Sequence, residues 1–390
     1  DYSILLIIYK SFKMIHIPFH KINYDNNEYK AAVSVMKSGW LTMGPKGRLL
    51  ENLFVKKMGS KKNKFALTVS SCSTALHLSL IALGVGKNDE VICPSLTFVA
   101  DANAIKYVGA KPIFCDTASE DDLSICYKDI EKKITKKTKA IIVVHYAGYP
   151  VNLKNILKIA KKYKIKIIED SCHSLFSDFK NTKLGNFGDL SVFSFYSNKN
   201  ITSGEGGMIY GEKKYMEKIS LLRNHGIKRN NFSSKKFNSQ YDVIHCGYNY
   251  RLNEISSSIL IEQLKKIDIL NRRRKALAIY YKKKIKEFLP DFKIPFSKHI
   301  GGKFSYHIFP IIIPENINRS KLMSYLKDKG VETTTHYIPI NKLKFYKSNI
   351  KLSNLDKIYK RLISLPLYPS LKKTELDYVT KCIVNYIKDN

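Results

Sequence analysis

Short runs of β-branched and other apolar residues alternate with segments of helical periodicity over the first two-thirds of the chain. The run at 140–144, Ala-Ile-Ile-Val-Val, is apolar at every position, which is typical of a strand buried on both faces. This pattern predicts an α/β fold in which a mainly parallel sheet lies between helical layers, with ligands at the carboxyl ends of the strands. The predicted strands are Lys64–Val69, Glu90–Ser95, Lys111–Asp116, Ala140–His145, Lys164–Asp170, Leu190–Phe195 and Gly207–Tyr210.

The pattern changes near Leu260. Long Lys-rich amphipathic segments follow, then a predicted strand at Tyr306–Ile313 and a predicted helix at Ser320–Lys329. We therefore predict a large domain at residues 14–264 and a smaller C-terminal α+β domain at residues 265–390. A chain of 390 residues with 44% hydrophobic content is long enough to bury a core in each.

The first thirteen residues fit neither domain. Their apolar run at Ile4–Ile8 is too short to cross a bilayer, and it follows an acidic residue without the basic region of a secretory signal. We interpret residues 1–13 as a non-native or disordered extension, and we expect no membrane association.

The formal net charge of +34 comes from 67 Lys and Arg residues against 33 Asp and Glu residues. Charge alone leaves nucleic acid, a membrane surface and a nucleotide substrate open as partners. The basic residues are spread over nearly every segment without a basic arm, which favours a solvated surface over nucleic-acid binding. The seven cysteines have no C-x-x-C or other metal-ligand spacing, which predicts reduced thiols, a cytoplasmic protein and no metal site.

Three segments carry candidate chemistry, and each has a simpler structural interpretation when taken alone. Ser70–Leu76 joins the first strand to a helix, where free amides suit a phosphate, although Ser/Thr residues there are also ordinary N-caps. Asp170 ends a buried strand, where a carboxylate can keep a heterocyclic nitrogen protonated; it could instead cap a helix or bind a metal. His173, three residues later, could be a structural histidine.

The third segment places Ser194 and Lys199 just beyond another buried strand, ahead of a glycine-rich turn at 204–207 that could also be a hairpin. A lysine in a partly desolvated pocket is suited to forming a Schiff base, whereas most lysines of such a chain lie on the surface. A phosphate cradle, an acid for a ring nitrogen and an imine-forming lysine are together the three attachments that pyridoxal 5'-phosphate (PLP) requires.

The order of these segments resembles the DegT/DnrJ/StrS family of sugar aminotransferases. The likeness runs from about Ile15 to Leu371. It implies the aspartate-aminotransferase-like fold of type I PLP enzymes, with a three-layer large domain around a mainly parallel seven-stranded sheet. The matching pieces are Gly39–Pro45, Asp89–Phe98, Val144–Gly148, Gly247–Arg251 and Ser364–Pro366.

The resemblance also implies residue roles. Lys199 would bind the cofactor covalently, Asp170 would meet its pyridine nitrogen, Phe98 would stack on its ring, and His173 would sit near its phenolic oxygen. Cys72, Ser73 and Ser194 would bind its phosphate, and Asn249 would reach the cofactor phosphate of the neighbouring subunit in a homodimer with shared active sites. The implied substrate residues are Thr42, Gly44, Arg251, His336 and Tyr337.

Two departures bear on these roles. Cys72 and Ser73 stand where a Gly-Thr pair is commoner, which an amide-based cradle tolerates if the backbone angles suit a residue other than glycine. Asn341 occupies a position often filled by histidine, so sugar recognition could differ.

The implied reaction is transfer of an amino group from L-glutamate, which leaves 2-oxoglutarate, to a nucleotide-linked keto-sugar in surface glycan or polysaccharide synthesis. One alternative is a nucleotide-sugar dehydratase on the same scaffold, but related dehydratases carry histidine where this chain has Lys199. The other is a nucleic-acid-binding or regulatory protein, which only the charge suggests.

Overall fold

The computed structural model describes residues 15–59, 63–229, 241–299 and 302–390. Its centre is a seven-stranded sheet in the order β1-β9-β8-β5-β4-β2-β3. The antiparallel strand β9 lies between β1 and β8, and the remaining neighbours pair in parallel. The strands are β1 (Lys64–Val69), β2 (Glu90–Pro94), β3 (Lys111–Cys115), β4 (Thr138–Val144), β5 (Lys166–Asp170), β8 (Leu190–Ser194) and β9 (Gly207–Glu212).

These seven strands match the seven predicted ones, with ends that differ by at most two residues, and the predicted α/β fold is confirmed. The apolar run in β4 explains the layering. Ala140 and Ile142 pack into one core cluster, whereas Ile141 and Val143 pack into another on the opposite face. Because side chains alternate along a strand, a continuous apolar run fills both layers at once.

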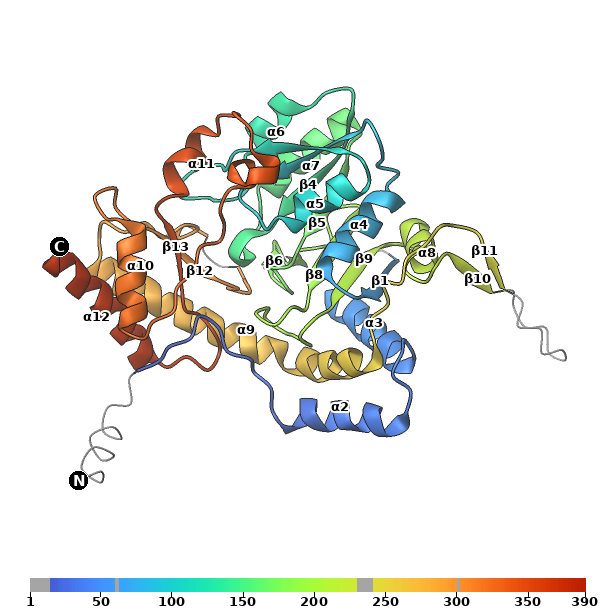
Figure 1. The fold of residues 1–390 in the computed structure, drawn as a ribbon, viewed down its shortest axis with the longest axis horizontal. Coiled ribbons are helices and arrows are strands. Elements are labelled where there is room, and N and C mark those ends of the chain that lie inside the picture. The colour runs from blue at the N-terminus through green and yellow to red at the C-terminus, as the bar shows by residue number, and fades with distance from the viewer. Residues whose placement is uncertain (1–14, 60–62, 230–240, 300–301) are drawn as a thin grey trace.

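Helices cover both faces of the sheet (Figure 1). Residues of α4, α5 and α8 share a core cluster with one face, and residues of α6 and α7 share a cluster with the other. Near β8 and β9 that second face is covered by α3 and α9. The helices are α2 (Asn26–Ser38), α3 (Pro45–Met58), α4 (Cys72–Ala82), α5 (Ala100–Tyr107), α6 (Tyr127–Lys133), α7 (Leu153–Tyr163), α8 (Lys213–Leu222) and α9 (Glu254–Phe288).

The described residues after α9, here called the C-terminal part, pack around a further core cluster at the far end of α9 (Figure 1), which also includes Leu96, Tyr146 and Tyr149. Its two strands, β12 (Phe309–Ile312) and β13 (Leu362–Leu365), pair antiparallel. The helices are α10 (Arg319–Asp328), α11 (Ser353–Ile358) and α12 (Lys373–Asp389). Helix α9 is continuous through the predicted boundary at 264/265, which stays a prediction. The predicted extension at 1–13 lies outside the described residues.

The long helix α9 is fixed by two buried charged side chains, one at its first turn and one beyond its midpoint. At its first turn, the Glu254 carboxylate accepts hydrogen bonds from the backbone N–H groups of Gly44, Lys46 and Gly47 at 2.7–3.0 Å. A carboxylate there also complements the positive end of α3. Further along, the buried Arg274 donates hydrogen bonds to the carbonyl groups of His307 and Leu367 at 3.1 and 2.7 Å. The helix therefore ties the loop before α3 to the C-terminal part.

The described structure also contains two short antiparallel ribbons. They are formed by β6 (Asp178–Phe179) with β7 (Thr182–Lys183), and by β10 (Ile227–Arg229) with β11 (Tyr241–Val243). The β10–β11 ribbon extends away from the sheet (Figure 1). Within the described ranges, no helix combines the length and the apolar character needed to cross a membrane.

Candidate active site

A cavity of about 530 Å³ opens at the carboxyl-terminal edge of the sheet. The ends of β4, β5 and β8 and the start of α4 meet there with the segment 334–337 of the C-terminal part. Nine of the residues predicted from the sequence line it: Cys72, Ser73, Phe98, Asp170, His173, Ser194, Lys199, His336 and Tyr337. Segments up to 265 residues apart in the chain thus contribute to one cavity of the size that small ligands occupy.

The predicted residues Thr42, Gly44, Asn249 and Arg251 are not in the lining of this cavity. The backbone N–H of Gly44 is bonded to Glu254. Asn249 is exposed, and its side-chain oxygen accepts a hydrogen bond from Arg251 Nε at 3.0 Å. The roles of these four residues remain predictions.

The start of α4 has the local structure of a phosphate cradle. Ser71 is the N-cap, and its hydroxyl accepts a hydrogen bond from the Thr74 N–H at 3.2 Å. The backbone N–H groups of Cys72 and Ser73 lie in the first turn of α4 and have no acceptor within the helix. They are at the positive end of the helix dipole. A Cβ atom on Gly207 would lie 2.4 Å from the Ser71 carbonyl oxygen. Position 207 is glycine because the start of β9 passes directly against the cradle.

Asp170 is the last residue of β5 and is 8% exposed. Its Oδ1 accepts a hydrogen bond from the Cys172 N–H at 2.8 Å. The sulfur atoms of Cys172 and Cys72 are 2.9 Å apart. These two sulfur atoms and a carboxylate oxygen of Asp170 all lie within 4.8 Å of one another. The sequence did not predict this contact, because the two cysteines are one hundred residues apart.

Lys199 lies in the turn after β8, where its N–H donates to the Tyr196 carbonyl at 2.9 Å. Its side chain lines the cavity together with Asp170. The positive charge of Lys199 also reaches the two buried histidines of the site: burial, helped by Lys199, lowers the pKa of His336 to about 3. The lysine and the acid thus face the same enclosed space, as the sequence predicted.

His173 is a neutral side chain held between two elements. Burial, followed by the charge of Lys199, lowers its pKa well below the ordinary value. Its Nδ1 accepts a hydrogen bond from the Ala147 N–H at 3.3 Å, so the proton of the neutral ring is on Nε2. Nε2 lies 3.0 Å from the Tyr337 hydroxyl and donates to it. Burial raises the pKa of Tyr337 well above its ordinary value, so this hydroxyl keeps its own proton to donate.

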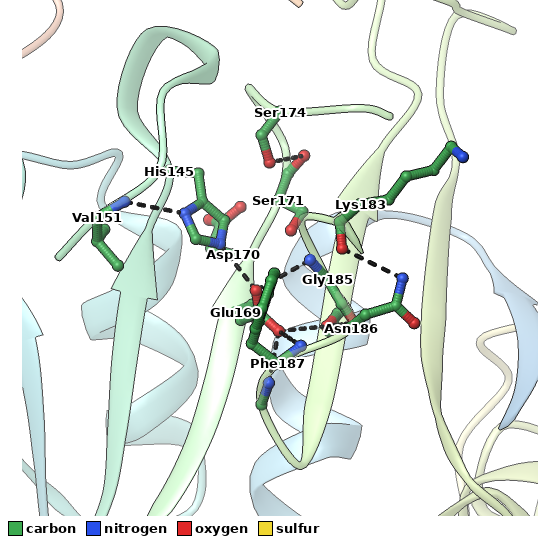
Figure 2. A network of polar contacts seen from close by, with 12 residues as sticks. His145, Val151, Glu169, Asp170, Ser171, Ser174, Lys183, Gly185, Asn186 and Phe187 are labelled. Atoms are coloured by element: carbon green, nitrogen blue, oxygen red, sulfur yellow. Dashed lines mark hydrogen bonds and ion pairs between the residues drawn. The ribbon is translucent and has the colours of Figure 1, made fainter. Parts of the chain in front are cut away.

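The neighbouring acid, Glu169, belongs to a buried network on the other face of β5. Its carboxylate accepts hydrogen bonds from the backbone N–H groups of Gly185, Phe187 and Gly188 at 2.6–2.9 Å. His145 Nε2 lies 2.9 Å away, and His145 Nδ1 accepts from the Val151 N–H. Figure 2 shows the carboxylate enclosed between His145 and the loop at Gly185–Phe187. Burial opposes the ionised form, but His145 and the amides outweigh it and hold the pKa of Glu169 below its usual range.

The comparisons with known proteins agree with this geometry. Residues 23–384 match the model of the DegT/DnrJ/EryC1/StrS aminotransferase family. The chain belongs to this family. It is 39% identical to an uncharacterized protein of Methanocaldococcus jannaschii over 376 residues. The matched segment covers 93% of this chain and 95% of that protein.

Two solved structures of the same fold give further comparisons. Helicobacter pylori PseC, an aminotransferase involved in the biosynthesis of pseudoaminic acid, is 30% identical, with a TM-score of 0.88 over 96% of this chain and all of PseC. Spr1654 of Streptococcus pneumoniae in its PLP-form is 26% identical, with a TM-score of 0.88 over 96% of this chain and 99% of that one. The chain is therefore a PLP-dependent sugar aminotransferase.

Replacement of Glu169 by glutamine is expected to destabilise the fold. Glu169→Gln puts an N–H₂ group among backbone N–H donors and leaves His145 without its charged partner. Each buried donor left without an acceptor costs about 1–3 kcal/mol of unfolding free energy, which denaturant unfolding measures. Glu131→Gln is the matched control, because Glu131 pairs with Lys162 on the surface, and it should change stability little.

The same pair of proteins gives a pH test. Because the folded-state pKa of Glu169 is lowered, its stabilisation is complete above the unfolded value of about 4.3 and is lost as the pH falls through the folded value. The stability difference between wild type and Glu169→Gln should therefore shrink in acid. A difference that stays constant through acid pH would contradict an ionised Glu169.

Proposed function

We propose that this enzyme transfers an amino group from L-glutamate to the keto group of a nucleotide-linked sugar, with PLP held covalently by Lys199. The observation that carries the proposal is that Lys199, Asp170 and the start of α4 line one cavity. An amine, an acid and a set of free amides are what the aldehyde, the ring nitrogen and the phosphate of PLP each need. The fit extends to Phe98, which lines the same cavity and is 58% exposed.

Each side chain has a role that follows from its chemistry. When bound, PLP supplies an electron sink that stabilises the negative charge left at Cα of an amino acid. Asp170 would keep the ring nitrogen protonated, and Lys199 Nζ, once released, would move the proton from Cα. Phe98 would cover one ring face. His173 would orient the Tyr337 hydroxyl through the 3.0 Å hydrogen bond, which leaves the phenol proton free for a bound oxygen.

We also propose that the enzyme works as a homodimer in which Asn249 reaches the cofactor phosphate of the other subunit. Asn249 lies outside the cavity of its own chain and is exposed. Large apolar side chains are also exposed on α2 and the loop that follows it, and on β11 and the residue after it, as expected of a subunit interface. They are Tyr29, Met36, Trp40, Leu41, Tyr241, Val243 and Ile244. A cytoplasmic location and a pathway of surface glycan or polysaccharide synthesis complete the proposal.

The covalent attachment is tested by Lys199→Ala. The wild type incubated with PLP should show the visible absorption band of a lysine-bound cofactor, and L-glutamate should shift it. Lys199→Ala should lose the band and lower turnover by roughly 10²–10⁴-fold, because both the attachment and the proton carrier are removed. Lys213→Ala, an exposed lysine on α8, is the control. A normal band in Lys199→Ala would end the proposal.

The reaction itself is tested with a panel of nucleotide-linked keto-sugars and glutamate, read by product mass. We expect a sugar in which an amino group replaces the carbonyl oxygen, with 2-oxoglutarate formed in equal amount. A deoxy sugar without added nitrogen would instead support the dehydratase. Amination of one member of the panel would also identify the nucleotide, the sugar and the carbon that receives the nitrogen.

The shared active site is tested by mixing inactive variants. In the proposed dimer, each active site combines Lys199 of one subunit with Asn249 of the other. When Lys199→Ala pairs with Asn249→Ala, both substitutions fall in one site, and the other site is intact. Co-expression should recover about a quarter of wild-type activity for random pairing. Lys199→Ala with Asp170→Asn is the matched control and should stay inactive, because both residues belong to the same share. No recovery in the first mixture would contradict the role of Asn249.

A further inference from the structure

A second carboxyl group lies beside Asp170, behind the wall of the cavity. Asp101 is in the first turn of α5, three residues after Phe98, and is 1% exposed. Its side chain is within hydrogen-bonding reach of the Asp170 carboxyl group. The mechanism above gives Asp101 no role, and it does not line the cavity.

The two oxygens of Asp101 have different surroundings. Oδ2 accepts a hydrogen bond from the Thr97 hydroxyl at 2.6 Å. Oδ1 is fully buried, and no group among the described residues donates a hydrogen bond to it. An ionised Asp101 would leave this oxygen desolvated, which is costly in a buried site. A protonated Asp101 would instead have a donor available for its neighbour.

The groups that face Asp101 in the described structure give its negative charge no compensation. They are Asp170 at the end of β5, Cys72 on α4, Cys93 on β2 and Tyr337 in the C-terminal part. Burial, and then the charge of Asp170, raise the pKa of Asp101 well above its ordinary value. Two adjacent buried carboxyl groups do not both ionise. Asp170 is the member that keeps the charge, because it is the more exposed and already accepts the Cys172 N–H.

We propose that Asp101 is a positioning residue that remains protonated and donates its carboxyl proton in a hydrogen bond to the ionised Asp170. This bond fixes the orientation of the Asp170 side chain and stabilises its negative charge. The consequence, which rests on the proposed function, is that a proton shared between Asp170 and the cofactor ring nitrogen stays on the nitrogen. Asp101 thereby supports the protonated ring without contacting it.

The protonation of Asp101 is tested in the cofactor-free protein. Protein with ¹³C at the aspartate side-chain carboxyl carbons gives an NMR signal that Asp101→Asn removes, which assigns it. We expect this signal to have the chemical shift of a protonated acid and to stay there between about pH 6 and 8, where an ordinary aspartate is ionised. A carboxylate shift in this range overturns the proposal, whether or not the protein binds PLP.

The coupling to the cofactor is tested with PLP labelled with ¹⁵N in its ring. Asp101→Asn keeps a neutral donor of the same shape, so the ring nitrogen should remain protonated as in the wild type. Asp101→Leu removes the donor. Its ring signal should move toward the unprotonated form, and its dissociation constant for PLP should rise roughly ten- to a hundredfold, as for loss of a hydrogen bond to a charged group.

Two results would overturn the coupling. If Asp101→Asn lowers ring protonation as much as Asp101→Leu, Asp101 acts through a negative charge. If Thr97→Val, which keeps the side-chain shape but removes the hydroxyl that donates to Asp101 Oδ2, shifts the ring signal as far as Asp101→Leu, the ring responds to how Asp101 is held and not to the proton that Asp101 donates. Failure of PLP to bind the wild type would count against the proposed function, and the carboxyl signal of the cofactor-free protein would still decide the state of Asp101.

Discussion

The active-site geometry depends on the burial of an ionised Glu169 at the end of β5. Glu169 and Asp170 are adjacent in a strand, so their side chains point to opposite faces of the sheet. His145 and three backbone amides bind Glu169 on one face, which fixes the register of the last two residues. Asp170 is thereby directed to the cavity, beside Val144 of the neighbouring strand. A buried charge outside the cavity thus determines the position of the carboxylate that lines the cavity.

Much of this arrangement could be predicted from local patterns. The run at 140–144 indicated a strand buried on both faces, and the observed split of its side chains between two core clusters has that cause. Parallel strands end at one edge of a sheet, so residues that follow β5 and β8 were expected to meet. Asp170 and Lys199 do so. The Ser71 cap followed from its hydroxyl at the start of an apolar helical pattern.

Other features depend on contacts that no local pattern encodes. The Cys72–Cys172 contact and the Asp101–Asp170 pair join segments from different parts of the sheet. Asp101 lies at a helix start, where an acidic residue is ordinarily a favourable exposed neighbour of the dipole, so its burial was not foreseeable. The neutral state of His173 depends on its burial and on the charge of Lys199, which its own segment of sequence does not encode. For Glu169, the signal was present as two consecutive acids at the end of an apolar strand.

The length of α9 has a mechanical consequence. Its 35 residues form a rod of about 50 Å, held at Glu254 by the loop before α3 and at Arg274 by carbonyl groups of the C-terminal part. A rod fixed in this way resists bending, so a swing of the C-terminal part would displace the anchored loop by leverage. Adjustment to ligands of different size therefore costs the least free energy in the side chains and turns at the rim of the cavity. The sheet with its helices and the C-terminal part would then move together.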